Sequence, residues 1–364
     1  GATDIYTPAT DEQIARTCEL ARQALEQGAA GISFGLGYTP GTALKEVYAL
    51  ARVAKEFGRL ITVDTRMRDD YDLSSLADVI QVARDTGVRV LVSHLVYQYG
   101  ECVMEESLQM LDKARALDIW ADSGMYVDWA TTIGSECFRE SYVFAHKDLL
   151  PDLLVATGKY AGQRLNDRLY HEMRAHLPKE TVIRITGADA SIPIAFTRRY
   201  TMPSSDTAPY NPGEGHPQVA GTFPAFFRMV RTQANLNLCD AVRRCTLLPA
   251  QVMGFELAQC CPKGYELDGV EVIRDLKEAV RGRDIICTDS LTHGELHDFK
   301  KYQVTTEIMQ LANGGAMLNP CPPFYRGEEV SAEVMKSPYF VGYAFKSHLL
   351  EIHQAILIFN LLHS

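Results

Sequence analysis

The sequence predicts an α/β protein built on a parallel sheet with crossover helices, arranged either as a barrel or as an open sheet. Apolar stripes at helical spacing alternate with short apolar runs typical of buried strands through residues 1–206. The same alternation restarts beyond residue 260. The 364 residues are therefore expected to form two α/β domains, 1–255 and 256–364.

The first predicted helix shows how the elements are delimited. In residues 8–28, Thr10 is the expected N-cap, Gln13 completes a capping box, and Gly28 ends the helix. The same reasoning predicts further helices at 44–58, 73–87 and 104–118. Strands are predicted at 31–36, 60–65, 88–95, 119–126, 181–186 and 200–206.

The second domain is predicted to be smaller and to repeat the alternation. Its strands are expected at 285–290 and 316–321. Its helices are expected at 270–284, 305–315, 331–338 and 346–362. No glycine- or proline-rich linker separates the two domains.

Composition excludes several classes of protein. The net charge of −10 argues against non-specific binding of nucleic acid, which needs a basic surface. No apolar run approaches the length of a membrane span, so no membrane association is expected. Nine cysteines, an odd number without a CxxC pair, predict a reducing cytoplasm. The expected partner is a small-molecule substrate, and a homo-oligomer is left open.

Polar residues end several of the predicted strands, namely Ser33, Asp64, His94, Asp122 and Asp206. Because the carboxyl ends of parallel strands meet at one edge of a sheet, this placement predicts a polar site there. His94 could bind a metal through its imidazole or be a hydrogen-bonded histidine of the edge. Asp206 could take a proton from water or be a turn residue. The loop 203–218, which carries His216, is expected to cap the site.

Five stretches occur in order over residues 1–255: "EQGAAGISFGLGYTPG", "TRMRDD", "VLVSH", "SSD" with "GHPQVAGTFPAFFR", and "LCDAVRRCTLLPAQVMGF". Together they resemble the D-aminoacylase (N-acyl-D-amino-acid deacylase) branch of the amidohydrolase superfamily. The resemblance implies a TIM-like (β/α) barrel, zinc, and a metal-bound hydroxide that attacks an amide carbonyl. It also implies that His94 is a metal ligand and that Asp206 is the catalytic residue that activates the water.

This half departs from the family pattern at identifiable positions. The family's "THMRDE" reads "TRMRDD", so its metal-binding histidine falls on Arg66 or, with a small shift, on Asp64. The family's "HPR" reads "HPQ", so Gln218 stands where an arginine would pair with the substrate carboxylate. The remaining substrate-binding candidates here are Arg68, Tyr126 and His216. The family's HxH pair and bridging cysteine would lie upstream of Gly1, so the barrel is expected to be partial.

The second half resembles a different family. "PKGYELD", "RGRDIICTDS", "KKYQVTTEIMQLANGGAML" and "NPCPPFYRGEEV" are similar to the C-terminal domain of aspartate/ornithine carbamoyltransferases, over about residues 260–364. The resemblance implies a doubly wound parallel sheet that binds the amino acid substrate. It implies substrate-binding roles for Asp289, Cys321 and Arg326. The family's phosphate loop, of the SxRTR type, does not occur upstream.

The function that these patterns favour is zinc-dependent hydrolysis of a C–N bond in an N-acyl amino acid or related amide, impaired if ligands are missing. One alternative is an amino-acid-binding, carbamoyltransferase-like half. Another is an inactive fusion or binding remnant. Since one pattern stops near Phe255 and the other begins near Cys260, the junction is expected to be a fusion of two incomplete modules.

Overall fold

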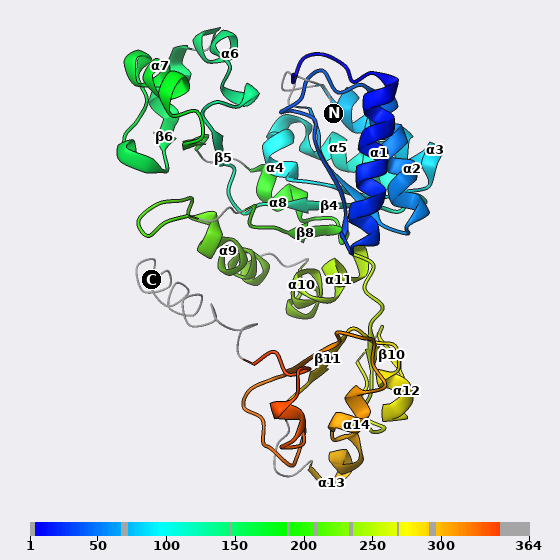
Figure 1. The fold of residues 1–364 in the computed structure, drawn as a ribbon. Coiled ribbons are helices and arrows are strands. Elements are labelled where there is room, and N and C mark those ends of the chain that lie inside the picture. Colours follow the sequence, from blue (N-terminus) through cyan, green and yellow to red (C-terminus); the bar gives the residue numbers. More distant parts are fainter. Residues whose placement is uncertain are drawn as a thin grey trace. The chain divides into compact units, whose positions relative to one another are not determined.

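The computed structural model describes residues 4–66, 72–145, 147–187, 190–206, 210–232, 236–267, 269–290 and 296–342 (Figure 1). The chain divides into two compact units, Gly1–Phe255 and Glu256–Ser364, each of which is considered by itself.

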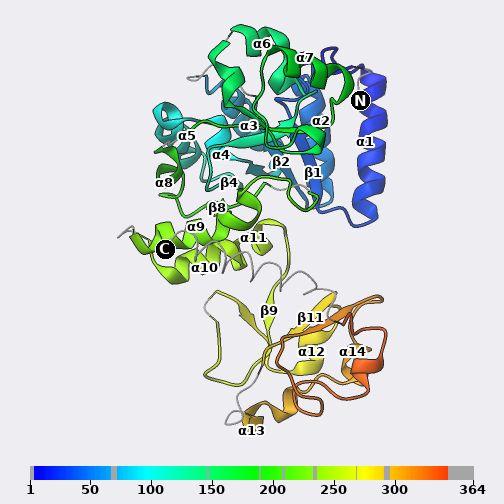
Figure 2. The same cartoon turned by 90° about the vertical axis from the view of Figure 1, so that its left-hand side faces the viewer.

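A five-stranded parallel sheet is the centre of the first unit (Figure 2). Its strands run in the order β1 (Gly31–Gly35), β2 (Leu60–Asp64), β3 (Arg89–Val92), β4 (Ile119–Ser123) and β8 (Thr201–Pro203). All neighbours pair in parallel, which confirms the α/β class and the parallel sheet. In the described residues β1 and β8 lie at opposite edges, so this sheet is open rather than closed into a ring.

Helix α1 (Asp11–Glu26) precedes β1, and crossover helices connect the strands that follow. They are α2 (Leu44–Glu56), α3 (Ser74–Thr86) and α5 (Glu101–Lys113). The capping box at Thr10 and Gln13 is confirmed, since the side chain of each accepts from the backbone N–H of the other. Apolar faces of α2, α3 and α5 pack with the central strands into one core, whose members include Val47, Leu76 and Leu108.

An insertion between β4 and β8 forms a second sheet with its own core. Its strands β5 (Trp129–Thr132), β7 (Thr181–Arg184) and β6 (Leu153–Val155) pair antiparallel in that order. The helices α6 (Glu140–Ala145) and α7 (Asp167–His176) accompany them, with 3₁₀ turns η1 (Glu136–Phe138), η2 (Lys147–Asp152) and η3 (Gly158–Tyr160). The strand predicted at 181–186 therefore exists, but its place in the parallel sheet was wrong. A short apolar run predicts a buried strand without specifying its partner.

The first unit ends in helices that follow β8, namely α9 (Gln218–Thr232), α10 (Leu238–Cys245) and α11 (Leu247–Val252). The short helix α8 (Ser191–Ala195) precedes β8 and packs against α5. Arg244 of α10 is buried and forms an ion pair with Asp240 at 2.8 Å. It also donates to the carbonyl oxygens of Phe196 and Arg198, so one guanidinium joins α10 to the segment before β8.

The second unit contains two parallel strand pairs, β9 (Ala258–Gln259) with β10 (Glu271–Val272), and β11 (Ile285–Thr288) with β12 (Met317–Pro320). Its helices are α12 (Leu276–Val280), α13 (Leu296–Phe299) and α14 (Thr306–Met309), with 3₁₀ turns η4 (Lys300–Tyr302) and η5 (Val334–Lys336).

The helix predicted at 270–284 was too long. Residues 271–272 form β10, and α12 begins only after Asp275, whose side chain caps the Glu278 N–H. The helix predicted at 346–362 lies outside the described residues.

Candidate functional site

The carboxyl edge of the parallel sheet brings together the residues that end its strands. Asp64 is the last residue of β2, and Asp122 lies near the end of β4. His94 follows β3, and Asp206 follows β8. The His94 Nε2 atom lies 3.4 Å from Oδ1 of Asp206, so residues distant in sequence form one imidazole–carboxylate pair.

Asp122 holds the two backbone segments that carry this pair. His94 has a left-handed backbone (φ 58°) and is the N-cap of the short helix α4 (Leu95–Gln98). Its backbone N–H donates to Asp122 Oδ1 at 3.0 Å. The hydroxyl of Ser204, just before Asp206, donates to the same oxygen at 2.6 Å. One buried carboxylate thus fixes both the β3–α4 turn and the end of β8.

Asp64 has a perturbed acidity. Burial raises the pKa of its carboxyl to about 6, and the negative charges of Asp206 and Asp122 add to the effect, while His94 opposes it. The side-chain amide of Gln98, at the end of α4, donates to Asp64 Oδ1. Asp64 therefore keeps its proton to a higher pH than an ordinary aspartate.

His216 and Tyr126 lie together beside the start of α9. His216 is 4% exposed, and its Nδ1 accepts from the backbone N–H of Gln218 at 3.0 Å. Burial lowers the pKa of His216, so its imidazole is neutral at pH 7. The rings of Tyr126 and His216 meet edge to face, with centroids 5.7 Å apart. Arg68, the third candidate of this group, lies outside the described residues.

Gly221 of α9 makes the close approach of Tyr126 possible. A side-chain Cβ at that position would lie 2.0 Å from the Tyr126 hydroxyl oxygen. Only glycine leaves room there for the phenol against the helix backbone. The position of Tyr126 is therefore set by α9 as well as by its own loop.

Sequence reasoning missed several residues of this edge. Tyr97 and Gln98 lie on α4, three and four residues after His94, and both contact other site residues. Their helical spacing from His94 was the available signal. Tyr38 and Cys137 also belong here. Burial raises the pKa of each, with Asp64 a further cause for both, and no local pattern marks either.

The described residues do not complete a metal site. No group of three or more His, Cys, Asp or Glu side chains among them is arranged to hold a metal ion. His94 Nε2 faces Asp206, and Asp64 Oδ1 accepts from Gln98. Structural and catalytic zinc both need at least three protein ligands, so His94 and Asp64 alone do not fit one.

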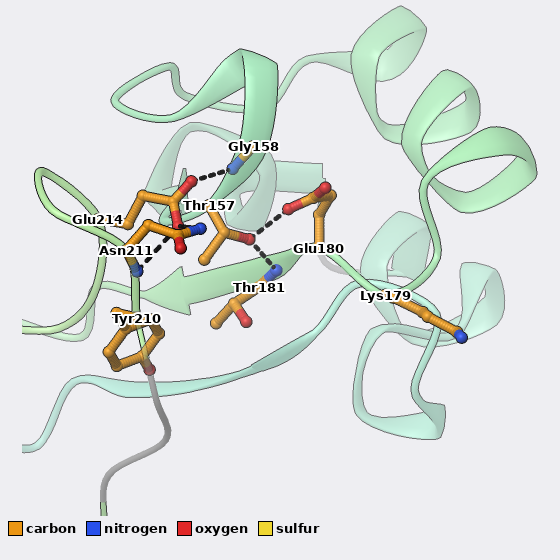
Figure 3. A pocket seen from close by; sticks show the side chains of 8 residues that line it. All are labelled: Thr157, Gly158, Lys179, Glu180, Thr181, Tyr210, Asn211 and Glu214. Atoms are coloured by element: carbon orange, nitrogen blue, oxygen red, sulfur yellow. Dashed lines mark hydrogen bonds between the residues drawn. The ribbon is translucent and has the colours of Figure 1, made fainter.

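A separate cavity of ≈ 280 Å³ lies in the insertion, away from the strand ends (Figure 3). None of the predicted site residues lines it. Glu214 there accepts from the Gly158 N–H at 2.8 Å and from the Asn211 amide at 2.9 Å. Glu180 accepts from the Thr157 hydroxyl on the opposite wall. The bond from Gly158 to Glu214, with that from the Gly215 N–H to the Ala156 carbonyl, holds the loop 210–215 to the insertion.

In the second unit, Asp289 and Cys321 also follow paired strands. Asp289 comes directly after β11 and Cys321 after β12, and the Cys321 N–H donates to the Thr288 carbonyl at 3.0 Å. The Asp289 carboxylate accepts from the N–H of its neighbour, Ser290, at 2.9 Å. Arg326 is exposed and forms a β-bridge with Val330. The structure therefore places Asp289 and Cys321 at one edge.

Comparison with known proteins assigns different relatives to the two ends of the chain. Residues 239–359 match the family model of the aspartate/ornithine carbamoyltransferase, Asp/Orn binding domain. Ornithine carbamoyltransferase of Chromobacterium violaceum is 35% identical over 144 residues, which are 35% of this chain and 46% of that protein. The enzyme of Nitrosococcus oceani is 37% identical over 120 residues, or 28% of this chain and 40% of that protein. The chain thus spans less than half the length of these curated relatives.

Solved structures similar to this chain include deacylases. A crystal structure of D-aminoacylase matches with a TM-score of 0.58 and 24% identity, covering 69% of this chain and 54% of that one. N-acyl-D-glutamate deacylase from Bordetella bronchiseptica, complexed with zinc and a phosphonate inhibitor, matches with a TM-score of 0.57 and 25% identity. That match covers 70% of this chain and 55% of the deacylase.

The chain combines two resemblances. Its fold is similar to that of D-aminoacylases over about 70% of its length, and its C-terminal third is similar in sequence to carbamoyltransferases. Both predicted resemblances are confirmed. Among the described residues, no helix is both long and apolar enough to span a bilayer.

Proposed function

We propose that the first unit hydrolyses a C–N bond in an N-acyl amino acid or a related amide. The observation that carries the proposal is the His94–Asp206 pair at the carboxyl edge of the parallel sheet, with a separation of 3.4 Å. Similarity to deacylases of known structure supports the same reaction class. Enzymes with such sheets place their chemistry at this edge.

The proposed chemistry is general acid–base catalysis by Asp206. Its carboxylate takes a proton from water as the water oxygen bonds to the amide carbonyl carbon. When the C–N bond breaks, the same proton passes to the leaving nitrogen, giving a carboxylic acid and an amine. His94 holds the orientation of Asp206 through the contact between its Nε2 and the carboxylate. Tyr126 and His216, with Arg68, are the proposed substrate-binding residues.

Zinc remains a proposal for this chain. The deacylase structure from Bordetella bronchiseptica is described with zinc, and His94 and Asp64 are the residues that would contribute to holding it here. A bound zinc ion would polarise the carbonyl and acidify water. Because the described residues supply no group of three ligands, no step above depends on the ion.

The test is amine release from a panel of N-acyl amino acids, measured with the whole chain in the presence and absence of added zinc. Asp206→Asn keeps the shape of the side chain but removes the base, so turnover should fall by about 10²- to 10⁴-fold. The matched control is Asp85→Asn on α3. The carboxylate of Asp85 accepts a hydrogen bond from the Tyr48 hydroxyl at the surface. Undiminished turnover by the Asp206 variant would exclude the mechanism.

A second function is supported by the family match of residues 239–359. We propose that the second unit binds an amino acid, with Asp289, Cys321 and Arg326 as contact residues. The test is the thermal unfolding of the whole chain with ornithine or aspartate, because a ligand that binds only the folded state raises its stability. An unfolding midpoint unchanged by either amino acid would exclude this second function.

A further inference from the structure

Gln218 joins three parts of the candidate site through one buried amide. It is the first residue of α9 and is 1% exposed. Its Nε2 donates to the backbone carbonyl of Asp206 at 2.7 Å, and its Oε1 accepts from the Tyr97 hydroxyl. The end of β8, the helix α4 and the start of α9 are therefore connected by this side chain.

The chemistry of the partners determines which way the amide faces. A backbone carbonyl can only accept, so the group of Gln218 that faces Asp206 is its NH₂. The amide oxygen then faces Tyr97, whose hydroxyl must donate. Burial, together with the charges of Asp206 and Asp122, raises the pKa of Tyr97, so this donor keeps its proton at neutral pH.

The backbone that Gln218 contacts is in an unfavourable conformation. Asp206 has a φ of 41°, in the left-handed region that residues other than glycine rarely adopt. Such conformations persist where surrounding contacts hold them, and they are concentrated at functional sites. The hydrogen bond from Gln218 is such a contact, and it acts on the residue whose carboxylate faces His94.

We propose that Gln218 is a positioning residue, which holds the Asp206 backbone in the conformation that directs its carboxylate toward His94. The contacts form a closed ring, since Tyr97 also lies against His94, with ring centroids 5.6 Å apart. This inference rests on the proposed function, because it takes Asp206 to be the base in the hydrolysis. The position that Gln218 gives to Asp206 can be measured without turnover.

The kinetic test uses Gln218→Met, which keeps the length of the side chain and removes both hydrogen bonds. Its kcat should fall by about 10²-fold with little change in KM, because misplacing a catalytic group by about 1 Å has that effect. Tyr97→Phe removes one donor only and should lower kcat by less. The double variant should be no slower than Gln218→Met, since both changes break one chain of contacts. Additive losses would overturn the proposal.

The second readout is the ¹³C chemical shift of the Asp206 carbonyl, measured by NMR in the whole chain. It should move in Gln218→Met because the carbonyl loses its donor. An unchanged signal in folded Gln218→Met would overturn the proposal, whatever happens to kcat. If the wild type has no turnover, the proposed hydrolysis fails, while this signal still tests Gln218. If Gln218→Met does not fold, the test uses Gln218→Glu, which keeps the acceptor for Tyr97. The ¹³C signal of the Asp206 carbonyl must then move in Gln218→Glu.

Discussion

Each unit has parallel strands whose carboxyl ends carry polar candidates, but the two edges differ in their contacts. At the edge of the first unit, His94, Asp122 and Asp206 are joined across three strands. At the edge of the second unit, Asp289 bonds its neighbour Ser290, and the Cys321 thiol contacts its neighbour Pro322. Within the described residues, the candidate side chains of the first edge contact groups on other strands, whereas the side-chain hydrogen bonds of Asp289 and Cys321 at the second edge are to their sequence neighbours.

This difference teaches which edge is organised before a ligand arrives. Preorganised charged groups are what acid–base catalysis requires, since their geometry then needs no adjustment during reaction. A site whose side chains contact only their sequence neighbours suits binding, because the ligand can then become their hydrogen-bond partner. Four experiments test this difference between the two units.

Arg244 and Arg274 compare a buried with an exposed arginine. Arg244 is 1% exposed and bonds Asp240 and two carbonyls, so Arg244→Ala should lower the free energy of unfolding by about 3–5 kcal/mol. Arg274 in the second unit pairs with Glu266 and donates to the carbonyls of Cys261 and Pro262, but its side chain is 45% exposed, so Arg274→Ala should cause a smaller loss. Urea denaturation of both variants measures the two effects. Equal losses would contradict the contrast.

His94 and Asp289 compare the two edges directly. His94→Asn removes the imidazole that faces Asp206, and the rate of amide hydrolysis should fall by about 10²-fold. Asp289→Asn should leave this rate unchanged, because its contact is confined to its neighbour. Steady-state assays of both variants at one pH measure this. A comparable loss in the Asp289 variant would show that the second edge takes part in the hydrolysis.

His216 and His297 compare a buried with an exposed histidine. Because burial lowers the pKa of His216 below its ordinary value of 6.5, the unfolded chain binds the proton more readily than the folded one. Stability should therefore fall as the pH drops through 6.5 and below, and His216→Gln should flatten that fall. The side chain of His297 is 98% exposed, so His297→Gln should leave the pH dependence of stability unchanged. Thermal unfolding from pH 7.5 to pH 5 measures the slopes.

The last comparison concerns the ligand of the second unit. Ornithine at about 100 times its dissociation constant should stabilise the chain by about 2.7 kcal/mol, and Asp289→Asn should reduce that gain. Asp206→Asn should leave it intact, since that residue belongs to the first edge. Thermal unfolding of the wild type and both variants with and without ornithine checks both statements. A gain lost in the Asp206 variant would mean that ornithine binds at the first edge.

The sequence by itself determined the strands of the parallel sheet and the helices between them, the capping box at Thr10, and the strand-end positions of Asp64, His94 and Asp206, because helical and strand periodicity are local properties. Only the tertiary structure decided that the strand at 181–184 pairs within an insertion, since an apolar run does not encode its partner. Only it placed Gln218 against Asp206 and Tyr97. A sequence shows that an arginine is absent at that position; which groups the glutamine bonds instead depends on the packing of β8, α4 and α9.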